Sequence, residues 1–281
     1  MADATTTILN KPAWVDLSSS DPTASREFYA SLFGWDITVS ADPQYGGYAM
    51  AKIGDKDVAG IGPTQSPQAP TAWMLYIGTH DAEVLAAKVQ AGGGTVIAPP
   101  FDVADLGRMA VFQDPTGAFI SAWQPVSMGG FSTGGPNTFG WAELNARGIE
   151  KAIPFYSHVF GWTHATREMG EGQPPYTEFQ LGAESIAGGM EMNPMVPALV
   201  PSYWMVYFTV DDVDRSFRTA IGAGGQTMLP PHDFPGGRFA ILSDPQGAVF
   251  GVIKMAWPRR LLVQQGPVHD GRNHRGARHM G

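Results

Sequence analysis

Apolar and polar positions follow one another in a fixed order along the chain. In the segment WVDL (14–17) apolar and polar side chains alternate, which predicts a short strand. The next segment, SDPTASREFYASLFGW, carries Phe28 and Leu32 one helical turn apart and predicts an amphipathic helix. Gly34 should end this helix, because glycine adopts the left-handed conformation at low cost. Trp35 is then expected to fold back as the apolar residue after the cap.

Further short strands and a second helix complete the predicted unit. Strands are expected around residues 48–53, 57–62 and 73–78, and the last of these opens a second module. In that module a helix ended by glycines, HDAEVLAAKVQAGGGTV, precedes strands at 109–113 and 119–124. Each unit is therefore interpreted as a pair of β-α-β-β-β modules, which makes an α+β fold.

The same unit occurs twice, at offsets of 127 to 131 residues. The matching segments are WVDL with WAEL, FYASLFGW with FYSHVFGW, WMLYI with WMVYF, and GRMAVFQDPTGAF with GRFAILSDPQGAV. The chain is therefore predicted to hold four modules in two domains, residues 8–126 and 138–257. A linker rich in glycine, serine and threonine (127–137) separates them, and a basic tail (258–281) is expected to be disordered.

Composition narrows the function classes. The 281 residues carry a net charge of −8, which argues against nucleic acid as a partner. There is no cysteine, which excludes disulfides and thiolate chemistry, and no apolar run long enough to span a membrane. The N-terminus has no signal-peptide pattern, so a cytoplasmic protein is expected.

Several motifs together resemble the vicinal oxygen chelate superfamily, also called the glyoxalase/bleomycin resistance/dioxygenase fold, in its two-domain actinobacterial form. They are the FY…FGW helix ends, VDDVD (210–214), the AGG helix stops at Ala91 and Ala223, and the DPTG and DPQG turns at Asp114 and Asp244. The resemblance implies that paired modules form cup-shaped sheets, and that each cup holds a divalent metal and a ligand. Some members of this type are linked to polyketide or anthracycline pathways.

The positions that bind metal in the family carry unsuitable residues here. They correspond to Trp14 and Trp141, Met74 and Met205, and Ser121 and Gly251. Indole has no acceptor lone pair, and a thioether is a poor ligand for hard cations. The sequence therefore predicts no metal and no other cofactor, which argues against the metal-dependent activities of the family.

Strand alternation predicts the side chains that line the cups, most of them aromatic or methionine. The candidate ligand-binding residues are Trp14, Tyr48, Met50, Met74, Tyr76, Trp123, Trp141, Tyr176, Met205, Tyr207, His232 and Arg238. Aromatic rings stack on planar ligands and methionine adapts to irregular shapes, so a flat aromatic molecule is expected. The alternative is that these side chains only fill the cup as core, with Arg238 in a structural ion pair.

Three carboxylates are the candidate catalytic residues: Glu143 and Glu178 in the second domain and Asp16 in the first. Buried carboxylates are costly without partners, and an apolar cup raises the pKa of a carboxylate, so one of them could act as a general base. The second domain holds two of the three and is the favoured working site.

Three functions remain open from the sequence. The first is a metal-independent protein that binds an aromatic polyketide or antibiotic for sequestration or accessory biosynthetic use. The second is a cofactor-free lyase, isomerase or hydrolase of secondary metabolism with a cup carboxylate as acid or base. The third is an interaction protein with filled cups, an accessory to a partner oxygenase. A monomer or a homodimer is expected, since two domains in one chain imitate the dimer of single-domain members.

Overall fold

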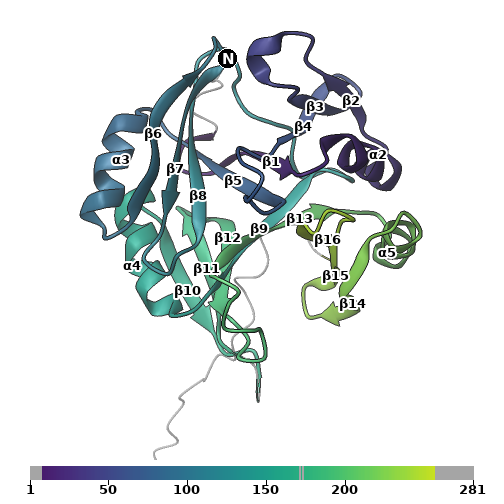
Figure 1. Ribbon diagram of the computed structural model, residues 1–281. Coiled ribbons are helices and arrows are strands. Elements are labelled where there is room, and N and C mark those ends of the chain that lie inside the picture. Colours follow the sequence, from purple (N-terminus) through teal and green to yellow (C-terminus); the bar gives the residue numbers. More distant parts are fainter. Residues whose placement is uncertain (1–7, 171, 173, 257–281) are drawn as a thin grey trace, which may run out of the picture.

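The computed structural model describes residues 8–170, 172 and 174–256, and the predicted tail lies outside this part of the chain. It contains two eight-stranded mixed sheets, one formed by each half of the chain, with helices packed against them (Figure 1). The predicted α+β class and the duplication of the domain are confirmed. Among the described helices, none is long and apolar enough to cross a membrane.

The first domain contains the strands β1 to β8 and two α-helices. Its elements are β1 (Pro12–Ser19), α2 (Pro22–Phe33), β2 (Asp36–Val39), the short 3-10 helix η1 (Pro43–Tyr45), β3 (Ala49–Ile53), β4 (Lys56–Pro63), β5 (Ala72–Gly78), α3 (Ala82–Ala91), β6 (Thr95–Val103), β7 (Gly107–Gln113) and β8 (Phe119–Pro125). In its described residues, which leave out 171 and 173, the second domain repeats this order without a 3-10 helix. Its elements are β9 (Phe139–Ala146), α4 (Ile149–Phe160), β10 (Thr163–Arg167), β11 (Tyr176–Leu181), β12 (Glu184–Glu191), β13 (Tyr203–Thr209), α5 (Val213–Gly222), β14 (Gln226–Phe234), β15 (Gly237–Ser243) and β16 (Val249–Met255).

The two sheets have the same strand order. The first runs β2-β3-β4-β1-β5-β8-β7-β6 and the second runs β10-β11-β12-β9-β13-β16-β15-β14. In each, the first strands of the two modules (β1 with β5, β9 with β13) pair antiparallel at the centre. The central strands therefore carry side chains from both modules onto one surface.

The strand that follows each helix was missed by the sequence analysis. These four strands are β2, β6, β10 and β14, and all of them lie at sheet edges. An edge strand is half solvated and tolerates proline, so it lacks a buried apolar stripe. In β6 the residues TVIAPPFDV include two prolines and are mostly exposed. Their pattern therefore gave no strand signal.

The repeated helix ends behave as predicted. Gly34 and Gly161 adopt left-handed conformations, with φ of 68° and 70°, directly after α2 and α4. Trp35 then stacks on Tyr29, with ring centroids 5.9 Å apart. Its indole nitrogen also donates to the carbonyl of Asn137 at 2.8 Å, so the tryptophan after the cap contacts the linker.

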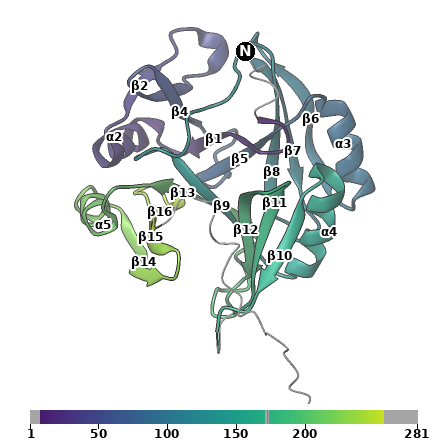
Figure 2. The same cartoon turned by 180° about the vertical axis from the view of Figure 1, so that it is seen from behind.

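The repeated helices also join the two domains. Helix α2 packs beside α5, and α3 packs beside α4, on opposite sides of the molecule in both views (Figures 1 and 2). Tyr29 of α2 donates to the carboxylate of Asp244 at 3.2 Å, and Tyr156 of α4 donates to Asp114 at 2.8 Å. Each FY motif thus reaches the DPxG turn of the other domain, and one apolar core extends through both halves.

Candidate functional site

Each sheet carries a second, smaller apolar cluster apart from the common core. In the first domain the buried residues of this cluster are Ala13, Trp14, Tyr76 and Trp123, and Met50, Met74 and Met109 pack against them. In the second domain they are Trp141, Met205, Tyr207 and Ile253. We call these surfaces the N-terminal cup and the C-terminal cup. The two cups bring together most of the lining residues expected from strand alternation.

The floor of the N-terminal cup holds one carboxylate between two tyrosines. Tyr48 and Tyr76 donate to the same oxygen of Asp16 at 3.1 and 3.0 Å. The indole of Trp14 donates to the hydroxyl of Tyr48 at 2.9 Å. Trp14 and Asp16 lie on β1 and Tyr76 on the neighbouring β5, while Tyr48 directly precedes β3 and reaches Asp16 across β4, so the sheet itself positions them.

The C-terminal cup repeats this arrangement with a longer acid. Tyr207 donates to Glu143 at 3.3 Å, and Tyr176 forms a second hydrogen bond with the same carboxylate. The indole of Trp141 donates to Tyr176 at 2.9 Å. Asn145 donates a further hydrogen bond to Glu143 at 3.4 Å, and this partner was not foreseen from the sequence.

A glycine beneath one tyrosine makes each arrangement possible. Gly60 pairs with Asp16 in the register of β4 and β1, and Gly188 pairs with Glu143 in the register of β12 and β9. A β-carbon at Gly60 or Gly188 would lie 1.7 or 1.9 Å from the tyrosine hydroxyl above it. A glycine inside a strand often marks such a close approach, and this signal could have identified both positions.

Burial sets the protonation of these groups. It raises the pKa of Asp16 from 3.8 to about 6, although hydrogen bonds from the two tyrosines oppose the shift. Burial also raises the pKa of Glu143, against its hydrogen bonds from Tyr176, Asn145 and Tyr207. The pKa of Tyr176 and of Tyr207 lies well above 10 because of burial and the neighbouring carboxylate. The tyrosines therefore remain protonated donors at neutral pH.

Glu178 distinguishes the C-terminal cup from the N-terminal one. Its side chain is 5% exposed and accepts hydrogen bonds from Ser185 and from Gln180. The register places Glu178 opposite Gly188, and the equivalent residue opposite Gly60 is Met50. In the row across the strand glycine, the C-terminal cup therefore carries two carboxylates, Glu143 and Glu178, where the N-terminal cup carries Asp16 alone.

The residues at the family's metal positions do not fit a divalent cation. In the C-terminal cup the nitrogen of Trp141 is a hydrogen-bond donor, and Met205 offers only a thioether. A β-carbon at Gly251 would lie 2.0 Å from the ring of Tyr207, so a carboxylate there would have to displace this ring. Within the described residues no three histidine or acidic side chains gather as metal ligands.

The two cups are covered differently. Phe131 of the linker packs edge-on against Trp14 with ring centroids 5.7 Å apart. The linker carbonyl of Met128 accepts a hydrogen bond from Trp123 at 3.0 Å, and Ile8 packs against the same cluster. Among the residues that the structure describes, which end at Ala256, the apolar cluster of the C-terminal cup consists of side chains from its own strands. The linker, which the sequence analysis treated as a spacer, is thus part of the N-terminal cup.

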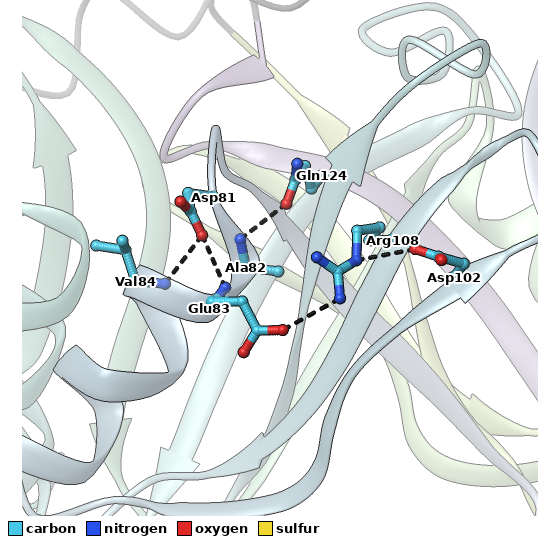
Figure 3. A network of polar contacts seen from close by, with 7 residues as sticks. All are labelled: Asp81, Ala82, Glu83, Val84, Asp102, Arg108 and Gln124. Carbon is cyan, nitrogen blue, oxygen red and sulfur yellow. Dashed lines mark hydrogen bonds and ion pairs between the residues drawn. The ribbon is translucent and has the colours of Figure 1, made fainter.

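Two of the candidate ligand-binding residues, Arg238 and His232, lie away from the floor of the C-terminal cup. Arg238 forms a two-pronged ion pair with Asp214 of α5 and a second ion pair with Asp233, so it lies on the helix side of the sheet. Its counterpart in the first domain shows the same design, since Arg108 binds Glu83 of α3 and Asp102 of β6 (Figure 3). The structural ion pair, which was the alternative interpretation of Arg238, is the arrangement observed.

His232 occupies a different place from Arg238. It is exposed on the edge strand β14 and packs edge-on against Phe239, with ring centroids 6.0 Å apart. Phe239 in turn contacts Tyr207, so His232 lies at the rim of the C-terminal cup rather than on its floor.

Comparisons with known proteins agree with this architecture. The model of the glyoxalase/bleomycin resistance protein/dioxygenase superfamily matches residues 11–121 and again 138–252. A Mycobacterium tuberculosis protein named "Putative glyoxylase CFP32" is 42% identical over 251 residues, which cover 87% of this chain and 95% of that protein. The anthracycline biosynthesis protein DnrV of Streptomyces peucetius is 39% identical over 259 residues, covering 87% and 93%.

Solved structures resemble the chain in fold at low sequence identity. A Mn(II)-bound glyoxalase from Novosphingobium aromaticivorans superposes with a TM-score of 0.62 at 17% identity, covering 88% of this chain and 82% of that one. The dioxygenase LapB from Pseudomonas sp. KL28 gives a TM-score of 0.63 at 15% identity, covering 88% and 92%. At these identities the likeness concerns the arrangement of strands and helices.

Proposed function

Because the chain belongs to the glyoxalase/bleomycin resistance protein/dioxygenase superfamily, we propose that it is a metal-independent member that binds a planar aromatic small molecule in its C-terminal cup. The relatives DnrV of Streptomyces peucetius and DauV of a Streptomyces strain are anthracycline biosynthesis proteins, which supports a role in secondary metabolism. Sequestration or accessory biosynthetic use of a polyketide or antibiotic would fit this context.

One observation carries the proposal: a carboxylate held by two tyrosines on a floor of tryptophan and methionine. Trp141, Met205 and Tyr207, which are 5%, 2% and 4% exposed, form a buried aromatic and thioether layer of the kind on which an aromatic ring system stacks. The Glu143–tyrosine group can exchange hydrogen bonds with carbonyl or phenol groups at the edge of such a ligand. A few polar groups on an apolar floor are typical of small-molecule sites.

The position of the linker favours the C-terminal cup over the N-terminal one. Phe131 and Met128 already pack on Trp14 and Trp123, where an aromatic ligand would stack in the first domain. An incoming ligand would have to displace them and expose their apolar surface to water, which opposes binding.

A second candidate function is proton-transfer catalysis on the bound ligand. Glu143 has a raised pKa and lies beside Tyr207, which stays protonated at neutral pH. The carboxylate could remove a proton from a carbon next to a ligand carbonyl, while Tyr207 donates its proton to the carbonyl oxygen. The result is an enol. Glu143 then returns its proton to another carbon of the conjugated ligand while the enol hydroxyl returns its proton to Tyr207, which completes an isomerisation without a cofactor.

Tryptophan fluorescence titrations with anthracycline-type and simpler quinones, corrected for absorption by the ligand and repeated with EDTA, test the proposed function. We expect saturable micromolar quenching that EDTA does not change. Quenching lost with EDTA would contradict metal independence, and its absence across the panel would contradict the aromatic ligand.

The variant Glu143→Gln separates binding from catalysis, with Asp16→Asn as its matched control in the other cup. If the protein is an enzyme, Glu143→Gln should abolish conversion of a neutral quinone while the affinity for that quinone stays nearly intact, and Asp16→Asn should leave both unchanged. If wild-type protein at stoichiometric concentration returns the ligand unaltered, the chain is a binding protein.

A further inference from the structure

We propose that the C-terminal cup selects aromatic ligands that carry a positive charge, such as a protonated amine, and that Glu178 together with Glu143 is the determinant of this selectivity. The inference rests on the proposed function, because it names the ligand class of the same cup. It follows from the arrangement of charges, which differs between two cups of otherwise similar design.

The two carboxylates lie in one row across the sheet. Glu178 of β11 pairs with Gly188 of β12, and Gly188 pairs with Glu143 of β9. Since neighbouring strands are about 4.8 Å apart, the two acidic residues are separated by one glycine strand at roughly 10 Å between their backbones. The hydroxyl of Tyr176 fills the space above this glycine and hydrogen bonds to Glu143. Both acids therefore border the same patch of floor.

The N-terminal cup has a different balance of charge at the matching positions. Met50 stands where Glu178 stands, and two residues later Lys52 replaces Gln180. Lys52 forms an ion pair with Asp57 at 3.3 Å. The C-terminal cup thus replaces the apolar Met50 by an acid and the Lys52–Asp57 ion pair by the neutral Gln180 and Ser185, so its floor carries one more negative charge.

The described part of the protein gives neither acid a cationic partner. Glu143 is held by tyrosines and an asparagine, and Glu178 by a serine and a glutamine. The ion pairs of Lys11, Lys52, Arg108 and Arg238 within that part join neither Glu143 nor Glu178. Partly desolvated carboxylates without a counter-ion attract a cation more strongly than exposed ones, because the surrounding dielectric constant is lower.

Arg167 is the cation that the register brings nearest on this side of the sheet. It pairs with Tyr176 on the edge strand β10 and is exposed to solvent. Its guanidinium group lowers the negative potential at the rim. If the cup attracts cations, replacing Arg167 with glutamine should strengthen the binding of a cationic ligand.

Three tricyclic probes of similar shape test the charge preference of the full chain: proflavine, a cation, anthracene methanol, a neutral analogue, and anthracene carboxylate, an anion. We expect isothermal titration calorimetry to show proflavine binding about tenfold or more tighter than the neutral probe, with the anion weakest. Added salt should weaken proflavine binding and leave the neutral probe nearly unchanged.

Variants assign the preference to the row of acids. Glu178→Met installs the residue of the other cup and should lower proflavine affinity about tenfold while neutral-probe affinity stays within about twofold. Glu178→Gln removes the charge but keeps the size of the side chain and its ability to hydrogen bond, so it is less disruptive to the fold. Thermal melts of both variants would reveal misfolding. Met50→Gln is the matched control and should change neither affinity.

The outcomes separate the two proposals. If the neutral or anionic probe binds wild-type protein as tightly as proflavine, or if both Glu178 variants keep the preference for proflavine, the charge selectivity is wrong while an aromatic cup stands. If none of the three tricyclic probes binds, the aromatic cup is wrong and the selectivity falls with it.

Discussion

The two cups of this protein show how a duplicated site can keep its chemistry and change its access. Both place a carboxylate between two tyrosine hydroxyls above a strand glycine, with a tryptophan nitrogen on one of the tyrosines. The N-terminal cup lies under Phe131 and Met128 of the linker, and its second acid position is Met50. Linker residues thus pack on the aromatic floor of one copy, while in the other copy an acid stands in place of a methionine.

Among the substitutions that test the difference between the cups, the largest effect should come from replacing the glycine of the C-terminal cup. Gly188→Ala puts a methyl group 1.9 Å from the present position of the Tyr176 hydroxyl, so the ring must leave Glu143. Overpacking of this kind costs about 1–3 kcal/mol of stability. We expect ligand binding to fall more than tenfold in titration calorimetry.

Gly60→Ala is the matched substitution in the N-terminal cup and has the same steric cause. It should destabilise the fold by a similar amount and leave ligand affinity unchanged. Equal loss of binding in both variants would show that both cups bind ligand.

The carboxylate of the N-terminal cup should make stability depend on pH. Burial raises the pKa of Asp16 from 3.8 to about 6 in the folded protein, so the folded state resists ionisation. The free energy of unfolding should therefore fall as pH rises from about 4 to about 6, by about 3 kcal/mol when the group is fully ionised. Denaturant unfolding of wild-type protein and Asp16→Asn at several pH values isolates this contribution. A variant with the same pH profile as wild type would exclude it.

Opening the N-terminal cup should have a smaller effect on stability. Phe131→Ala removes a half-buried ring from Trp14 and should cost about 1–2 kcal/mol in denaturant unfolding. It also exposes a second aromatic floor. Calorimetry should then detect a second, weaker equivalent of neutral aromatic ligand. One equivalent in both proteins would mean that the linker is not what closes this cup.

The smallest effect on binding is expected from the arginines on the helix side. Arg238→Gln breaks ion pairs with Asp214 and Asp233, and Arg108→Gln breaks those with Glu83 and Asp102. Since neither guanidinium lies in a cup, ligand affinity should change less than twofold in either variant. A larger loss confined to Arg238→Gln would place this side chain in the binding site after all.

Much of the fold could be predicted from the sequence because it rests on local signals. Gly34 and Gly161 end their helices as their position after an apolar turn indicates, and the repeat itself predicts two domains. The edge strands were missed because their half-solvated residues, including the two prolines of β6, lack an apolar period. The period of apolar residues therefore predicts helices and strands with one buried face better than it predicts strands at a sheet edge.

The candidate site was predictable only in part, for a related reason. Strand alternation correctly placed Trp14, Tyr76 and Tyr207 in the cups, because their strands are central and regular. A structural ion pair was one interpretation of Arg238, but alternation could not identify its partners, and it could not foresee that Phe131 covers Trp14. Those contacts depend on packing between distant segments, which periodicity does not encode.

The crossed tyrosine–aspartate pairs have a consequence for synthesis of the chain. Tyr29 is synthesised 215 residues before its hydrogen-bond partner Asp244, and both residues are buried in the folded protein. At about 5–20 residues per second, the ribosome needs roughly ten to forty seconds to deliver this partner. During that interval the first half presents an apolar face, and the Tyr29 hydroxyl, which accepts a hydrogen bond from Trp73, lacks the carboxylate to which it donates. A nascent chain arrested before the second DPxG turn should therefore be a preferred chaperone client, and release should follow once that turn has left the ribosome.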